Sequence, residues 1–236
     1  MHPELIVALD VPDAEKVGAV LSLLPPEIRF FKVGLELYTA SGPKSVQILR
    51  AAGKHVFLDL KLHDIPRTVA RSITTAAQHG VSLLTLHAAG GKDMLRAAAD
   101  AAAGLGEHRP RLLAVTTLTS LGPEDLRDIG VTRSLAEHTL ALGRMAVAQG
   151  IDGLVCSVHE AEQLRKELGA APILVTPGIR PAGSHVGDQK RVATPASAVN
   201  AGANFLVVGR PIMEADDPAA AARIILDEIA AASTAR

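Results

Sequence analysis

Residues 55–73 have the sequence HVFLDLKLHDIPRTVARSI, in which an apolar run gives way to a helical pattern within a few residues. The run up to Lys61 has the branched and aromatic composition of a short buried strand. Pro66 suits the first turn of a helix, and Val69 and Ile73 follow at helical spacing. The stretch therefore predicts one strand followed by one helix, which is the repeating unit of parallel α/β folds.

The same alternation continues on both sides of this stretch, along the whole chain. Short Val-, Ile- and Leu-rich runs alternate with longer segments of helical spacing, a pattern typical of parallel βα units. The eight predicted strands are Leu5 to Asp10, Phe30 to Gly34, His55 to Lys61, Leu83 to Ala88, Arg111 to Thr119, Gly153 to Ser157, Ile173 to Ile179 and Phe205 to Arg210.

Eight such units in series predict a single (β/α)8 TIM barrel, one domain over residues 1–236. The chain length supports this prediction, because α/β barrels commonly have about 200 to 250 residues in one domain. A doubly wound open sheet is the alternative. No G-x-G-x-x-G motif, typical of the dinucleotide-binding version of that fold, follows any predicted strand.

The composition argues against several classes of function. Aromatic residues are 2% of the chain and Trp is absent, which disfavours a surface that stacks nucleic-acid bases. A formal net charge of −1 provides no surface-wide field for polyanions, so a phosphate group needs a local site. We therefore expect a small-molecule ligand and no nucleic-acid partner.

The N-terminal segment predicts neither export nor membrane insertion. Residues 1–4 lack a basic region, and the apolar run from Leu5 stops at Asp10. The single cysteine, Cys156, cannot form an internal disulfide and lies in an apolar run, so we expect a buried structural thiol. A cytoplasmic protein without a membrane partner is the expectation.

Charged residues gather at the carboxyl ends of the first three predicted strands, where barrel active sites are built. They are Asp10, Lys32, Asp59 and Lys61. Buried parallel strands are almost wholly apolar, so these charges need a reason. Asp59 and Lys61 are two residues apart, so their side chains should point the same way into the barrel mouth, about 6 to 7 Å apart.

Alternation of positive and negative groups would keep each lysine protonated and fixed. Opposite charges about 4 Å apart interact by roughly 4 kcal/mol at an effective dielectric constant near 20. A structural ion network that caps the core is the alternative, because such networks also perturb titration. Asp10 and Asp59 could instead hold Mg²⁺, although Lys32 and Lys61 would compete for the charge of that site.

A phosphate site is predicted after the last two strands. Gly209 lets backbone N–H groups approach a ligand, and Arg210 offers a forked donor where barrels commonly bind phosphate. Arg180 follows the seventh strand and begins a polar stretch to Thr194 that contains Gln189. Loops this long are usually functional, so residues 180–194 predict a lid over the phosphate. A solvent-exposed arginine and an ordinary surface loop are the alternatives.

These motifs, in this order, resemble the orotidine 5'-phosphate decarboxylase family, in its bacterial form, across essentially the whole chain. The segments that carry the resemblance are Ala8-Leu9-Asp10, Phe31-Lys32-Val33-Gly34, residues 59–66, His87-Ala88-Ala89-Gly90-Gly91, Leu118-Thr119-Ser120, Thr176-Pro177-Gly178-Ile179-Arg180, Asp188-Gln189 and Val208-Gly209-Arg210. The resemblance implies decarboxylation of orotidine 5'-monophosphate to uridine 5'-monophosphate and CO2, the last step of de novo pyrimidine nucleotide synthesis. It also implies that no cofactor and no metal take part.

The resemblance implies a role for each matching residue. Lys61 would protonate carbon 6 of the pyrimidine, and Lys32, Asp59 and Asp64 would complete a charged tetrad. The other implied contacts are Asp10 and Lys32 with ribose hydroxyls, Thr119 and Ser120 with the pyrimidine, and Arg180, Gln189, Gly209 and Arg210 with the phosphate.

The resemblance further implies an obligate homodimer whose two active sites are shared across the interface. Asp64, Ile65 and Thr68 would come from the partner subunit. This arrangement is consistent with the position of Asp64, five residues beyond Asp59 and past the predicted strand.

Two other functions use the same elements. A sister group of barrels, which includes ketogulonate-phosphate decarboxylases and hexulose-phosphate synthases, uses Mg²⁺ to stabilise an enediolate from a sugar phosphate, and Lys32 argues against that chemistry here. A non-catalytic sensor of a phosphate ligand would leave the pairing of Asp59 with Lys61 without a task.

Overall fold

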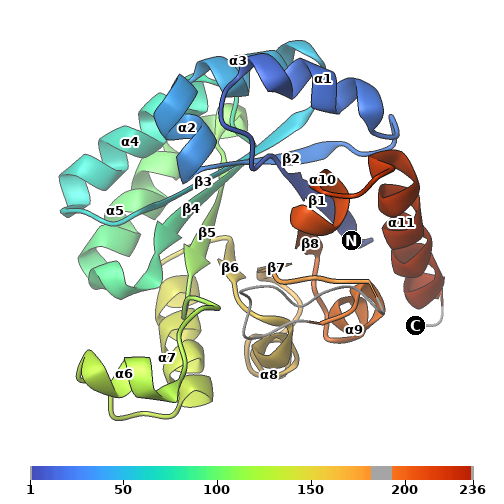
Figure 1. The fold of residues 1–236 in the computed structure, drawn as a ribbon. Helices are drawn as coiled ribbons and strands as arrows, with labels where there is room; N and C mark the ends of the chain where they lie inside the picture. The colour runs from blue at the N-terminus through green and yellow to red at the C-terminus, as the bar shows by residue number, and fades with distance from the viewer. Residues whose placement is uncertain (1, 182–192, 235–236) are drawn as a thin grey trace.

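The computed structural model of the chain describes residues 2–181 and 193–234. Its eight strands are parallel and form a closed barrel in sequence order, with the eighth strand paired to the first (Figure 1). The prediction of a TIM barrel is confirmed. The strands are β1 Glu4–Ala8, β2 Phe30–Gly34, β3 His55–Leu62, β4 Leu83–His87, β5 Arg111–Val115, β6 Gly153–Val155, β7 Ile173–Thr176 and β8 Phe205–Val208.

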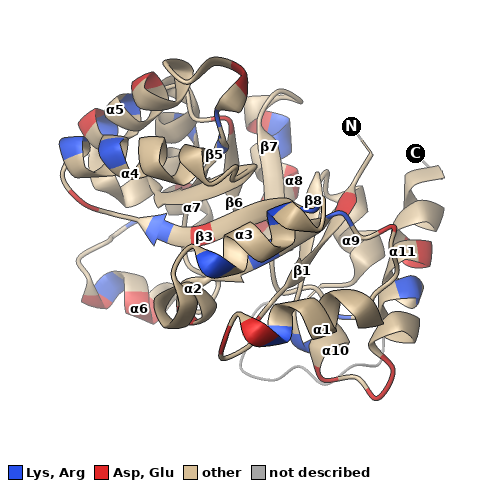
Figure 2. Ribbon diagram, turned by 90° about the horizontal axis from the view of Figure 1, so that it is seen from above, with Lys and Arg blue, Asp and Glu red and all other residues tan. Residues whose placement is uncertain are grey.

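Helices surround the barrel (Figure 1), and many of the charged residues lie on these helices (Figure 2). They are α1 Glu15–Leu23, α2 Leu35–Ser41, α3 Lys44–Ala51, α4 Pro66–Gln78, α5 Gly91–Ala103, α6 Pro123–Asp128, α7 Leu135–Ala148, α8 Val158–Leu168, α9 Pro195–Asn200, α10 Arg210–Met213 and α11 Pro218–Thr234, with short 3-10 turns at Ala88–Gly90 and Gly106–His108. No helix in the described part of the chain is long and apolar enough to cross a membrane.

Side-chain caps set the starts of the helices near the C-terminus. The Thr194 hydroxyl accepts a hydrogen bond from the backbone N–H of Ser197 at 3.1 Å. The Asp217 carboxylate accepts one from the N–H of Ala220 at 2.9 Å. In both cases proline follows at the first helical position, where its missing N–H costs nothing.

The core has two apolar layers because successive strand residues face opposite sides. On β1, for example, Leu5 and Val7 belong to the large cluster between the strands and the helices, whereas Ile6 and Ala8 belong to a smaller cluster inside the barrel. The Phe30 and Phe205 rings pack edge to face inside it, with centroids 5.0 Å apart. Both residues begin their strands, so the barrel is filled at its amino-terminal end and a cavity is left at the other.

Several strands end two to four residues earlier than predicted. Asp10, Thr119 and Arg210 lie beyond the ends of β1, β5 and β8, and Arg210 begins α10. The apolar runs continue past these points, but beyond the rim the residues no longer pair with a neighbouring strand. Asp10 and Thr119 therefore come from loops at the carboxyl rim, and Arg210 comes from the start of a helix, whereas Lys32, Asp59 and Lys61 lie on strands as predicted.

Candidate active site

A cavity of about 260 Å³ opens at the carboxyl ends of the strands. This volume is close to the lower limit of small-molecule pockets, about 300 Å³, and suits one ligand of nucleotide size. Eight of the predicted site residues line it, from both sides. They are Asp10, Lys32, Asp59, Lys61, Thr119, Arg180, Gly209 and Arg210.

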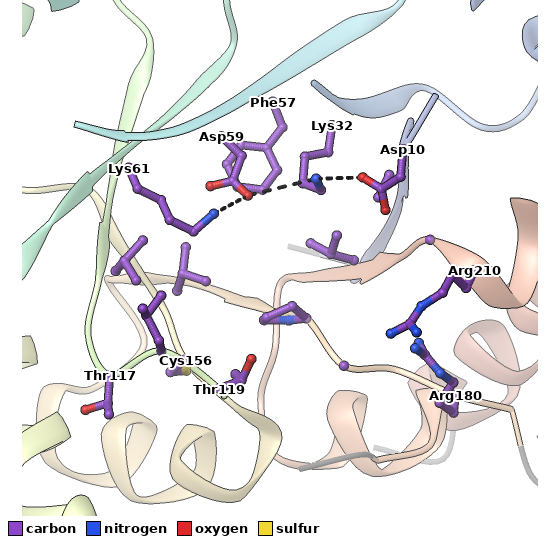
Figure 3. A pocket seen from close by; sticks show the side chains of 18 residues that line it. Asp10, Lys32, Phe57, Asp59, Lys61, Thr117, Thr119, Cys156, Arg180 and Arg210 are labelled. Carbon is purple, nitrogen blue, oxygen red and sulfur yellow. Dashed lines mark hydrogen bonds and ion pairs between the residues drawn. The ribbon is translucent and has the colours of Figure 1, made fainter. Parts of the chain in front are cut away.

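A row of alternating charges crosses one wall of this pocket (Figure 3). The Lys61 Nζ lies 2.9 Å from Asp59 Oδ2, and the Lys32 Nζ lies 4.0 Å from the same oxygen. Lys32 also contacts Asp10 Oδ1 at 3.3 Å. The side chains of Asp59 and Lys32 are each only 14% exposed, so water screens their interaction incompletely. The predicted approach of Asp59 and Lys61 is therefore present, and Lys32 joins Asp59 to Asp10.

The position of Lys32 does not suit a magnesium ion between Asp10 and Asp59. Its ammonium group already lies between the two carboxylates, so a cation bound to both would displace it or lie against like charge. Within residues 2–181 and 193–234, no three His, Cys, Asp or Glu side chains gather as a metal site would require.

Lys61 has a backbone conformation that the sequence did not indicate. Its φ angle is +51°, and it is the only non-glycine residue with positive φ in the described part of the chain. Such a conformation is uncommon for residues with a Cβ atom and costs of order 1–3 kcal/mol, so it persists only where the surroundings enforce it. Strained residues of this kind concentrate at functional sites, which supports Lys61 as a functional residue.

Two arginines lie across the pocket from the charged row. The Arg180 and Arg210 guanidinium groups point toward each other (Figure 3). Arg180 is 9% exposed, and its backbone N–H donates to the carbonyl of Ala193 at 2.9 Å. A Cβ atom on Gly209 would lie 2.9 Å from Asp10 Oδ2, so a side chain at this position would displace the Asp10 carboxylate. Paired guanidinium groups in a partly enclosed site favour an anion such as phosphate.

The remaining predicted site residues do not line this pocket. Asp64, Ile65, Thr68 and Ser120 are all exposed, and Ile65 is 67% exposed. Gln189 lies outside the described residues, as does most of the predicted lid, residues 180–194. The structure of one chain thus brings together the charged row and the arginines but leaves the first three of these residues at the surface.

Sequence reasoning missed the apolar part of the lining. Ala8, Phe57 and Val207 lie on strands, each two residues before a predicted site residue, and all three face the pocket. Alternation with a period of two could have found them, since side chains two apart share one face. Cys156 is buried as predicted, at 1% exposure, but it also lines the pocket.

A neutral histidine lies near Lys61. Burial, followed by the charges of His63 and Lys61, lowers the pKa of His87 below its ordinary value of 6.5. The ring centroids of His63 and His87 are 5.3 Å apart. Burial and these charges therefore favour the neutral form of His87.

The comparison with protein families agrees with this geometry. The model of the Orotidine 5'-phosphate decarboxylase / HUMPS family matches residues 3–225. The chain belongs to this family. The expected family membership is thereby confirmed. The expectation of a carboxy-lyase enzyme is confirmed by the family together with the names of the relatives described next.

Relatives named orotidine 5'-phosphate decarboxylase align with almost the whole chain. The orotidine 5'-phosphate decarboxylase of Halorhodospira halophila is 51% identical over 230 residues, covering 98% of this chain and 97% of the relative. That of Sodalis glossinidius is 47% identical over 225 residues, covering 95% and 89%. The crystal structure of orotidine 5'-phosphate decarboxylase from Lactobacillus acidophilus superposes with a TM-score of 0.86 at 39% identity, covering 96% of this chain and 99% of that one.

Proposed function

We propose that this chain decarboxylates orotidine 5'-monophosphate to uridine 5'-monophosphate and CO2, the last step of de novo pyrimidine nucleotide synthesis, without a cofactor. The observation that carries the proposal is the pairing, in one pocket, of the charged row with the two arginines on the opposite side. A pyrimidine nucleotide matches this layout, because its phosphate and its reacting ring are at opposite ends of the molecule. The cytoplasm remains the predicted compartment.

In the proposed reaction, the substrate carboxylate lies against Asp59. The bond between carbon 6 and the carboxylate carbon breaks, CO2 leaves, and the electron pair remains on carbon 6. The Lys61 ammonium group then donates a proton to carbon 6 and regains one from solvent. The row favours the later charge distribution, since Lys61 stabilises the carbanion while Asp59 repels the carboxylate that is lost.

The other residues would bind and orient the substrate. Asp10 and Lys32 suit ribose hydroxyls, because they lie at the end of the row that is nearer to Gly209 and Arg210. Thr119, with Ser120 next to it, is the proposed contact for the pyrimidine. Arg180 and Arg210, with Gly209, are the proposed phosphate ligands, and Gln189 remains a predicted one.

The first test is turnover in the presence of a metal chelator. Purified protein is mixed with orotidine 5'-monophosphate and excess chelator, and the loss of orotate ultraviolet absorbance is followed. We expect the same rate with and without chelator, because Lys32 and Lys61 supply the positive charge that a metal would otherwise provide.

The magnesium-dependent chemistry of the sister group gives the opposite result. Folded protein that leaves orotidine 5'-monophosphate unchanged, but acts on a pentulose or hexulose phosphate when Mg²⁺ is added, would overturn the proposed reaction. If the chelator abolishes turnover of orotidine 5'-monophosphate and added Mg²⁺ restores it, the cofactor-free mechanism would be overturned but the proposed substrate would not.

We further propose that the active site is completed by a second copy of the chain, in a homodimer. Asp64, Ile65 and Thr68 follow β3 at the same rim as the pocket, yet they are exposed and none lines it. Asp64 would then supply the fourth charge of the tetrad to the site of the partner.

Mixed dimers test this sharing of sites. Two inactive variants, Lys61→Ala and Asp64→Asn, are unfolded together and refolded. In half of the randomly formed dimers, one site receives both intact residues, so about a quarter of wild-type activity should return. A mixture of Lys61→Ala with Asp59→Asn is the control and should remain inactive, because both residues come from the same subunit. Absence of recovery in the first mixture, with mixed dimers demonstrated, would refute shared sites.

A further inference from the structure

We infer that Thr85 is a positioning residue for the proposed reaction: its buried hydroxyl holds the Lys61 backbone and the Asp59 carboxylate in the relation that catalysis requires. The inference rests on the proposed function, since it assigns a task to Thr85 through Lys61 and Asp59. Thr85 does not line the pocket and contacts no space open to a ligand.

The pairing of β3 with β4 is irregular at the point where the two charged residues lie. Phe57 and Leu58 pair regularly with Leu83 and Leu84, but the next pair is Leu62 with Leu86. Four steps along β3 therefore correspond to two steps along β4. Asp59 still pairs with Gly34 of β2, but on the β4 side the residues between Leu58 and Leu62 do not follow a regular parallel ladder. Contacts other than this ladder must therefore help to fix their geometry.

Thr85 lies on β4 between the two pairs that flank the irregularity, and its hydroxyl makes two hydrogen bonds. Thr85 Oγ1 accepts from the backbone N–H of Lys61 at 2.9 Å. It donates to Asp59 Oδ1, also at 2.9 Å. Asp59 Oδ2 is left to face the ammonium groups of Lys61 and Lys32. One side chain thus anchors the backbone of the first residue and orients the carboxylate of the second.

The strain at Lys61 explains why such an anchor is needed. A residue at φ +51° relaxes toward an ordinary conformation unless neighbouring contacts hold it. Thr85 is 0% exposed, so water cannot replace its bond to the Lys61 N–H. Without the hydroxyl, that N–H would lose this partner, and the Asp59 carboxylate would lose the hydrogen bond that fixes Oδ1 while its Oδ2 remained bound to Lys61. A displacement of about 1 Å in a reacting group can cost about 10²-fold in rate.

The test compares variants that keep or remove the hydroxyl at nearly constant volume. In Thr85→Val we expect kcat for orotidine 5'-monophosphate to fall about 10²-fold while KM changes less than about threefold, because binding groups across the pocket are untouched. Thr85→Ser keeps the hydroxyl and should stay within about fivefold of wild-type kcat. Thr85→Cys carries a weaker hydrogen-bond donor of similar size, so its kcat should lie between those of Thr85→Val and Thr85→Ser. This variant replaces Thr85→Val in the comparison if Thr85→Val does not fold.

Thr176→Val is the matched control. Thr176 is also a fully buried threonine on a barrel strand, but its hydroxyl donates to the carbonyl of Phe205 at 3.4 Å and, within residues 2–181 and 193–234, makes no hydrogen bond to a charged side chain. The Thr176→Val substitution should lower the melting temperature without changing kcat. Equal kcat in Thr85→Val and Thr85→Ser would overturn the inference, as would a loss confined to KM. Inactivity of the wild-type protein would instead overturn the proposed function, and the inference with it.

Discussion

Replacing Lys61 with alanine should lower kcat by about 10⁴-fold or more while the protein stays folded. The substitution removes the proposed proton donor, a contribution of about 10² to 10⁴. It also removes the positive charge beside carbon 6, and a lost electrostatic stabiliser typically costs about 10² to 10³. Alanine has a Cβ atom like lysine, so the backbone strain at φ +51° is not itself altered. The measurement is the loss of orotate absorbance at saturating substrate, with circular dichroism to verify folding.

Lys44→Ala is the control for this experiment. Lys44 lies at the start of α3, its side chain is 61% exposed, and its nearest acidic partner is Glu15 at 3.9 Å. Such exposed ion pairs contribute little to the free energy of folding, so we expect the Lys44→Ala variant to have wild-type kcat and nearly wild-type stability. A folded Lys61→Ala protein that retains most of its activity would remove Lys61 from the proposed mechanism.

Replacing Arg210 with alanine should lower kcat/KM for orotidine 5'-monophosphate by about 10³-fold. A forked guanidinium contact with phosphate comprises two charge-assisted hydrogen bonds, each contributing roughly 1.5 to 3 kcal/mol, and about 1.4 kcal/mol corresponds to a factor of ten. Arg180 is expected to retain part of the phosphate affinity, because it points toward the same place (Figure 3). Steady-state kinetics over a range of substrate concentrations separate the effect on kcat from that on KM.

The phosphate-free nucleoside orotidine shows whether Arg210 acts on the phosphate. If it does, the low kcat/KM of wild-type enzyme for orotidine should change less than about threefold in Arg210→Ala. Arg223→Ala, at an exposed position of α11, should leave the kinetics with both substrates unchanged. Equal losses with nucleotide and nucleoside would mean that Arg210 supports the structure of the rim rather than the phosphate.

How far the sequence could predict the site is clear from β3. The run from His55 to Lys61 predicted a strand, and two-residue spacing predicted that Asp59 and Lys61 share a face; the structure joins them at 2.9 Å. The two-residue alternation along a strand predicts which face of the sheet a side chain points to, because that depends only on the local backbone. It does not report the shifted register between Leu58 and Leu62 or the positive φ of Lys61. Those depend on β4, which lies more than twenty residues farther along the chain.

The same distinction applies to the rim. The apolar runs ending near Asp10 and Arg210 predicted where the charged groups and the phosphate site would gather. The strands nevertheless end earlier, since a strand continues only while a neighbour pairs with it. Thr85 was not predicted at all. A single threonine in an apolar strand carries no local pattern, and its importance comes from the two partners that the fold brings to it.

Composition and periodicity are local properties, and they were enough to predict the eight βα units, the barrel class and the chemical types at the carboxyl rim. Three other features became visible only in the folded chain: Lys32 joins Asp59 to Asp10, Arg180 and Arg210 share one wall, and the residues around Asp64 remain at the surface of the single chain. These relations depend on register, strand ends and barrel closure. Closure brings the first and last strands side by side, and their residues are about two hundred positions apart in sequence.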